Sequence, residues 1–260
     1  MQFLSKNLQD EYVGMLANSC NSNVCGYDIF DYNASSEPLV IRGILKHKLI
    51  KRCWADARDF YYIDSGYFGN QKSNKNPLGT KLYHRIVKND LQHGSVVERP
   101  DDRWLKLGLS LSEWRTGGRS ILVAAPDEKP CKFYGVDKDT WVAETVATIK
   151  QFTDRPVIVR DRAKLRSERI TNTLQEALSD TVALVTFNSV AATEAIMYGI
   201  PAFTLVNNAA SPMALQDLSK IETPYYPTMD ERYAWACHLA YGQFHVSELK
   251  DGSALRILGL

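Results

Sequence analysis

The sequence lacks the motifs that identify several common enzyme classes. Neither the G-x-x-x-x-G-K-[ST] phosphate loop nor the G-x-G-x-x-G dinucleotide fingerprint occurs, which argues against ordinary kinases, ATPases and dinucleotide-dependent enzymes. The G-x-S-x-G turn that carries the nucleophile of α/β hydrolases is also absent. No internal repeat or low-complexity segment occurs, so the function has to be sought in single strand-turn-helix units.

Paired cysteines and long apolar runs are missing as well. The five cysteines are odd in number and none forms a C-x-x-C pair, which argues against a disulfide framework or a zinc cluster and for a reducing compartment. No run approaches the ~20 apolar residues of a membrane span, and residues 1–14 lack the apolar core of a signal peptide. We therefore expect a soluble cytoplasmic protein.

The composition is that of a globular protein, with 45% hydrophobic and 23% charged residues in 260. This length suffices for one large domain or two small ones. The net charge is only +1, but residues 34–100 hold twelve Lys and Arg against six Asp and Glu. This basic region is either a solvated surface or a face for an anionic acceptor such as nucleic acid or an acidic glycan.

The strongest local pattern is VALVTFNSVAATEAIMYGIPAFTLV, residues 182–206. Its apolar, β-branched start predicts a buried strand over 182–187. Asn188 and Ser189 supply N-cap oxygens for a helix over 191–197. Gly199 suits a left-handed helix end, and the following proline leads into a strand over 202–206.

Such a turn predicts an anion site, because a helix N-terminus offers unpaired amides and the positive end of the helix dipole. A phosphate would rest on the amides of Ser189, Val190 and Ala191. Glu194, one helical turn farther on, would then reach a ribose hydroxyl. The alternative is a polar cap that binds nothing, with Glu194 as a solvated helix residue.

The segment FNSVAATEAIMYGIPAFTL resembles the nucleotide-binding signature of GT-B glycosyltransferases, most of all the capsule-polysaccharide and Kdo-transferase type and its short relatives in tailed bacteriophages. The matching positions are Asn188, Ser189, Glu194, Gly199 and Pro201. The resemblance covers roughly the second half of the chain. It implies that the turn meets the donor phosphates and that Glu194 meets the donor sugar or ribose. If a phage encodes the protein, its location is the host cytoplasm.

The fold class that we expect is α/β, with two Rossmann-like domains in a GT-B arrangement and parallel sheets flanked by helices. The resemblance implies an acceptor-side domain over 1–100 and a nucleotide-sugar domain over 101–260, whose late helix, predicted over 229–243, returns to the first domain. The alternation of strands with helices after residue 119 supports the parallel sheet. The ranges are 120–125, 156–160 and 182–187 for strands, and 140–152 and 173–178 for helices.

Ligands of such sheets bind beyond the carboxyl ends of the strands. Three loops meet that condition: the one after Ala125, residues 160–166, and the Asn188 turn. Arg160 and Lys164 suit a diphosphate, unless their loop is only solvated. Ser211, followed by proline, either forms another anion-facing turn or simply caps a helix over 213–218.

The first half has weaker patterns. They predict helices over 8–20 and 45–57 and strands over 27–32, 38–44, 60–63 and 81–87. Asp64 follows one of these strands and precedes a glycine turn, so it is either a general base or an Asx turn. The acceptor-side candidates, whose alternative is a surface or salt-bridge role, are His84, Arg85, Lys88 and His93.

The combined hypothesis is a glycosyltransferase that moves a sugar from a nucleotide-diphosphate sugar, such as a UDP-sugar, to a hydroxyl acceptor. GT-B enzymes generally lack a D-x-D metal site, and the DKD at 137–139 is placed to begin a helix, so we expect no metal and no cofactor besides the donor. Basic groups would stabilise the leaving phosphate. Asp64 would be the base of an inverting reaction, whereas a retaining one needs none.

Two acceptors are compatible with the sequence. One is a hydroxymethylated pyrimidine in phage DNA, which would have to be extruded from the duplex, and the basic first half favours it. The other is a polysaccharide or glycan. A different class of function, a non-catalytic module that binds a nucleotide sugar or a polyanion, remains the alternative to an enzyme.

Overall fold

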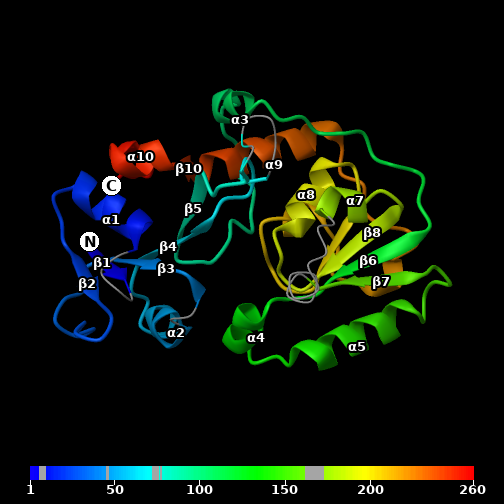
Figure 1. Cartoon of the computed structure of the whole chain (residues 1–260), viewed down its shortest axis with the longest axis horizontal. Coiled ribbons are helices and arrows are strands. Elements are labelled where there is room, and N and C mark those ends of the chain that lie inside the picture. The colour runs from blue at the N-terminus through cyan, green and yellow to red at the C-terminus, as the bar shows by residue number, and fades with distance from the viewer. Residues whose placement is uncertain (6–9, 45–46, 72–75, 77, 162–172) are drawn as a thin grey trace. The chain divides into compact units, whose positions relative to one another are not determined.

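The computed structural model describes residues 1–5, 10–44, 47–71, 76, 78–161 and 173–260 (Figure 1). The chain forms two compact units. The first comprises Met1–His93 together with Leu239–Leu260, and the second is Gly94–His238. Helix α9 (Met229–Tyr241) runs from the second unit into the first, because its last residues belong to the first unit.

The described residues of the first unit form a six-stranded sheet in the order β10-β5-β4-β3-β1-β2. Strands β1 to β4 are parallel, β5 is antiparallel to β4, and β10 is antiparallel to β5. The strands are β1 (Gln2–Ser5), β2 (Val24–Gly26), β3 (Leu39–Arg42), β4 (Phe60–Ser65), β5 (Tyr83–Lys88) and β10 (Gln243–His245).

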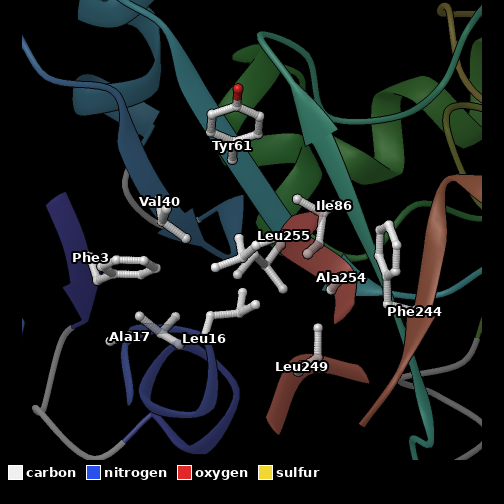
Figure 2. Packing of buried hydrophobic residues seen from close by; sticks show 12 residues of the cluster. Phe3, Leu16, Ala17, Val40, Tyr61, Ile86, Phe244, Leu249, Ala254 and Leu255 are labelled. Atoms are coloured by element: carbon white, nitrogen blue, oxygen red, sulfur yellow. The ribbon is translucent and has the colours of Figure 1, made fainter. Parts of the chain in front are cut away.

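Helices cover this sheet. They are α1 (Glu11–Ser19), α2 (His47–Ala55), α10 (Val246–Lys250) and α11 (Ser253–Ile257). The core lies between the sheet and three of them, α1, α10 and α11. Figure 2 shows Phe3, Val40 and Ile86 of the sheet packed with Leu16 of α1 and Leu255 of α11. Residues at alternate positions of a strand share a face, and Tyr61 and Ile63 of β4 accordingly both belong to this cluster.

The sheet of the second unit, as far as the structure describes it, has four parallel strands in the order β7-β6-β8-β9. They are β6 (Ser120–Ala124), β7 (Val157–Arg160), β8 (Thr181–Thr186) and β9 (Ala202–Thr204). The helical elements are α3 (Asp102–Leu107), α4 (Glu128–Tyr134), α5 (Lys138–Ile149), α7 (Leu174–Ala177), α8 (Ala191–Met197), and the 3₁₀ turns η2 (Ser211–Met213) and η3 (Leu218–Lys220).

The strand order creates a topological switch point between β6 and β8. The chain leaves β6 for β7 on one side and later returns to β8 on the other side of β6. Helix α5 therefore covers one face of the sheet, whereas α7 and α8 lie on the opposite face (Figure 1). The carboxyl edge at such a switch point is where open parallel sheets bind ligands.

The sequence-based prediction of an α/β protein with parallel-rich sheets flanked by helices is confirmed. The helix predicted over 191–197 has the bounds of α8. The strand predicted over 27–32 is wrong, because the strand of this region, β2, ends at Gly26 and a turn follows. The helix predicted over 213–218 is also wrong: η2 covers its first residue and η3 begins at its last.

One missed helix lies in the loop after Ala125. Helix α4 begins at Glu128 and contains a proline, a residue that normally argues against a helix. Pro130 stands third in α4, where a missing amide costs no hydrogen bond because the first amides of a helix have no carbonyl partner within it. The helix therefore accommodates this proline, and the segment after Ala125 is not the uninterrupted loop that was predicted.

Candidate functional site

The carboxyl ends of β6, β8 and β9 meet at one edge of the second unit's sheet. Ala124 is paired with Thr186, and the Thr186 hydroxyl donates to the Ala124 carbonyl at 3.2 Å. Thr186 is in turn paired with Thr204, and Ala124 with Arg160. The sequence-predicted donor residues that follow these strand ends therefore share this edge: Arg160, Asn188, Ser189, Val190, Glu194 and Ser211. Lys164 lies outside the described residues.

The Asn188 turn satisfies part of its own hydrogen-bonding capacity. The Ser189 hydroxyl accepts from the Ala191 amide at 3.2 Å, and the Thr186 hydroxyl accepts from the Ser189 amide at 3.4 Å. The N-cap of α8 is Val190, whose side chain cannot cap. Within the described chain, the Val190 amide donates to no protein atom. One of the three amides expected to hold an anion is thus unengaged, and the other two have long internal bonds.

Glu194 stands in the first turn of α8 and is partly buried. The pKa of the neighbouring Tyr198 is raised, first by burial and then by the negative charge of Glu194. Glu194 thus follows the Asn188 turn by one helical turn.

The far end of α8 is held rigidly. Arg232 of α9 is fully buried and donates through Nη2 to the carbonyls of Ile196 and Ser112, both at 2.7 Å. Its guanidinium also lies 4.1 Å from the centroid of the Trp114 ring. A cation at a helix C-terminus is favourable because the last carbonyls are unpaired and carry partial negative charge. Arg232 thereby anchors the helix that begins at the candidate turn.

Sequence reasoning missed one cation near this edge. Asp137 caps α5 by accepting from the Thr140 amide at 2.8 Å, as a helix-starting aspartate should. Lys138 forms a partly buried ion pair with Asp161, the residue that follows β7. Burial alone would lower the pKa of Lys138, but the bond to Asp161 outweighs it and the pKa is raised. The position of Lys138 at this edge becomes visible only when α5 and the end of β7 are brought together in the fold.

The Ser211 hydroxyl is hydrogen-bonded within its own loop. It accepts from the Asn208 amide at 2.8 Å and shares a hydrogen bond of 3.1 Å with the Thr204 hydroxyl. The residue opens the 3₁₀ turn η2, with Pro212 at the first turn. The hydroxyl thus ties the loop after β9 to the end of that strand.

In the first unit, Asp64 and Arg85 form an ion pair at 3.2 Å. The Asp64 carboxylate also accepts from the Tyr62 hydroxyl at 2.9 Å and from the Ser65 amide at 2.7 Å. Burial raises the pKa of Asp64, but the charge of Arg85 and these hydrogen bonds outweigh it, so the pKa lies below its usual range. The Asp64 side chain is 40% exposed and that of Arg85 only 8%, so a half-exposed carboxylate rests on a buried guanidinium.

The other acceptor-side candidates do not join this pair. His84 is buried, with its ring 3.8 Å from that of Tyr12 and Nε2 3.2 Å from the Lys81 carbonyl. An acceptor would reach His84 only if that ring stack opened. His93 shares a 2.9 Å hydrogen bond with the Tyr67 hydroxyl. Lys88 is exposed and pairs with Asp59 at 2.8 Å.

The register explains why Lys88 is remote from Asp64. Lys88 is paired with Tyr61 near the start of β4, whereas Asp64 is near its end. The two side chains therefore lie toward opposite ends of the β4–β5 strand pair.

Metal ligands are not clustered in the described part of the chain, where no three His, Cys, Asp or Glu side chains could hold an ion together. The five cysteines are free thiols. Among the described helices, none is long and apolar enough to cross a membrane.

No family model and no curated protein matches the sequence. Several solved structures share the fold, among them two Kdo transferases. The β-Kdo 2,7 transferase of Thermosulfurimonas dismutans KpsC superposes with a TM-score of 0.53 at 10% identity, over 98% of this chain and all of that one. The β-Kdo 2,4 transferase of the same KpsC gives 0.50 at 12% identity, over 86% and 85%. At these identities the likeness is one of fold.

Proposed function

We propose that this protein is a glycosyltransferase of GT-B arrangement, which transfers a sugar from a nucleotide sugar to a hydroxyl of a glycan. One observation carries the proposal: the fold shared with two Kdo transferases extends over most of the chain. The position of the Asn188 turn, after β8 at the switch point of a parallel sheet, supports it. The GT-B arrangement is part of the proposal.

The second unit is the proposed donor side. The Val190 amide and the Ser189 hydroxyl would bind the donor phosphate, with Arg160 and Lys138 as nearby cations. Groups that hold the charge of the departing phosphate lower the barrier without a metal. Lys138 would exchange its bond with Asp161 for the phosphate, whereas Glu194 would accept from a ribose hydroxyl. Lys164 stays a candidate for the same role.

The first unit is the proposed acceptor side, with Asp64 near the reacting hydroxyl. Its lowered pKa keeps the carboxylate ionised at neutral pH. A carboxylate of low pKa is a weak proton acceptor, so a role as general base requires that the bound acceptor weaken the Arg85 contact. A reaction that retains the anomeric configuration would require no such base.

The charge distribution favours a glycan over DNA as the acceptor. Several basic residues in the described part of the first unit are engaged: Arg42 pairs with Asp10 at 2.6 Å, Arg85 with Asp64, and Lys88 with Asp59. Arg58 is buried and donates to the main-chain carbonyls of Tyr32 and Glu37. Cations that are already paired with carboxylates displace few of the counterions bound to DNA. The release of these counterions is the main source of affinity for DNA. The structural relatives give no support to a DNA acceptor.

A transfer assay tests the proposal. The protein would be incubated with CMP-, UDP-, GDP- and ADP-sugars, each with an oligosaccharide panel or with hydroxymethylated DNA, and the products weighed by mass spectrometry. We expect a mass gain of one sugar on an oligosaccharide. A gain on DNA alone would refute the glycan acceptor. Nucleotide-sugar binding without any transfer or donor hydrolysis would identify a binding module instead.

A further inference from the structure

An aromatic cluster lies next to the candidate turn. Phe187, the residue before Asn188, has its ring 5.2 Å from that of Tyr134, with the planes at 86°, and 5.7 Å from that of Trp141. Phe133 touches Tyr134 as well, at 4.9 Å between centroids. Such edge-to-face pairs each add stability beyond the area they bury. The cluster therefore fixes the position of its members.

One aromatic residue of the cluster is exposed. Tyr134 is 37% exposed, whereas Phe187 is 5% and Trp141 8% exposed. Tyr134 is the last residue of α4, the helix that follows β6 (Figure 1). Because β6 and β8 are neighbours, a ring carried by the segment after β6 reaches the residue that follows β8. The exposed aromatic surface thus lies at the switch-point edge.

An exposed aromatic side chain alone is not informative, since much of a protein's surface is apolar. Phe152 of the same unit illustrates this, because it is 42% exposed and precedes β7, at the amino end of the strands. Tyr134 differs in its position at the ligand-binding edge and in its rigid support. A ring that neighbouring rings hold in place offers the kind of surface on which bases stack.

We infer that the Tyr134 ring is the stacking surface for the nucleobase of the donor. This inference rests on the proposed function and names a residue for its base subsite. A base on Tyr134 would place the attached ribose phosphate toward Asn188, the neighbour of Phe187 in the chain. Base-aromatic stacking tolerates different bases, because every base has a π-face. Tyr134 would therefore supply affinity, and other groups the choice of base.

Nucleotide titrations test this inference. Calorimetry with CMP, UDP, ADP and GDP would compare the wild-type protein with Tyr134→Ala, Tyr134→Phe and the control Phe152→Ala. We expect Tyr134→Ala to weaken the best-bound nucleotide about tenfold, the usual worth of one stacked base. Tyr134→Phe and Phe152→Ala should bind as the wild type does. NMR should show an upfield shift of the base protons with Tyr or Phe at position 134, and no such shift with Ala.

The outcomes separate the inference from the proposed function. If a nucleotide binds the wild type, but its base protons do not shift and Tyr134→Ala binds it equally well, the stacking role is refuted and the donor site stands. If no nucleotide binds the wild type, both fail. A parallel loss of affinity in Tyr134→Phe would also overturn the inference, because that variant keeps the ring.

Discussion

A Cβ atom on Gly199 would lie 2.0 Å from the main-chain carbonyl oxygen of Glu113. The glycine also has a φ of +74°, which L side chains rarely adopt. Around it, the amide of Ser112 donates to the Met197 carbonyl at 2.9 Å, and that of Arg115 to the Gly199 carbonyl at 2.8 Å. The end of α8 and the segment over 112–115 are thus packed backbone to backbone.

Gly199→Ala should therefore lower the free energy of unfolding by about 2–5 kcal/mol, from the left-handed conformation together with overpacking. Gly135→Ala is the matched control, since Gly135 ends α4 with a φ of +72° and a Cβ there would meet no atom within 4 Å. It should cost about 1–2 kcal/mol, the conformational part alone. Urea unfolding measures both, and equal losses would contradict the close approach to Glu113.

Val190→Pro should weaken donor binding. The N-cap has φ −63° and ψ −6°, which proline adopts without strain, so the substitution removes one amide and little else. We expect a loss of affinity of about ten- to a hundredfold, the worth of a hydrogen bond to a charged group. Val190→Ala keeps the amide and should bind normally. A Val190→Pro variant that is folded by circular dichroism and binds nucleotide at full strength would remove this amide from the phosphate site.

Glu194→Ala should weaken binding of a ribonucleotide while the protein stays folded. The carboxylate stands in the first turn of α8 and is assigned to a ribose hydroxyl. A matched 2′,3′-dideoxynucleotide lacks that hydroxyl, so its affinity should be equal in the wild type and in Glu194→Ala. Calorimetry with both ligands measures the difference, and an unchanged ribonucleotide affinity would reject the assigned contact.

Asp64→Asn should abolish transfer and leave donor binding intact, because Asp64 belongs to the proposed acceptor side. The variant also leaves the buried guanidinium of Arg85 without its carboxylate, so we expect a loss of stability of about 1–3 kcal/mol. Asp59→Asn breaks the exposed pair with Lys88 and should change neither transfer nor stability measurably. Full transfer activity in a folded Asp64→Asn protein would exclude Asp64 from the mechanism.

Acid should destabilise the protein through His84. Its burial first, and then the charge of Arg42, lower the pKa of His84 to about 4. Above pH 6.5 the imidazole is neutral in both states, so it adds no pH dependence. Below pH 6.5 only the unfolded chain binds the proton, and stability falls by about 3 kcal/mol down to pH 4.

The variant His84→Gln should flatten this slope of unfolding free energy against pH. Part of the slope should remain, because burial and the charge of Arg99 also lower the pKa of His238. A slope in His84→Gln as steep as in the wild type would contradict the neutral, buried state of His84.

The local features of the α8 unit could be predicted from sequence because they depend on neighbours in the chain. Helix formers between a polar turn and a glycine determine a helix wherever it lies, and α8 has its predicted bounds. Alternating strands and helices likewise imply parallel pairing. The strand predicted over 27–32 failed because aromatic and β-branched residues favour extended structure locally, whereas pairing requires a partner elsewhere. Val24–Gly26 instead pairs with β1.

The sequence by itself determined an α/β chain with a polar turn between two buried strands. Only the tertiary structure decided which groups stand beside that turn. Strand β6 lies next to β8 although β7 comes between them in sequence, and this order brings Tyr134 to Phe187. Register decided that Asp64 meets Arg85 and that Lys88 does not join them. Strand order and the choice of pairing partners depend on packing between distant segments, which the local sequence pattern does not specify.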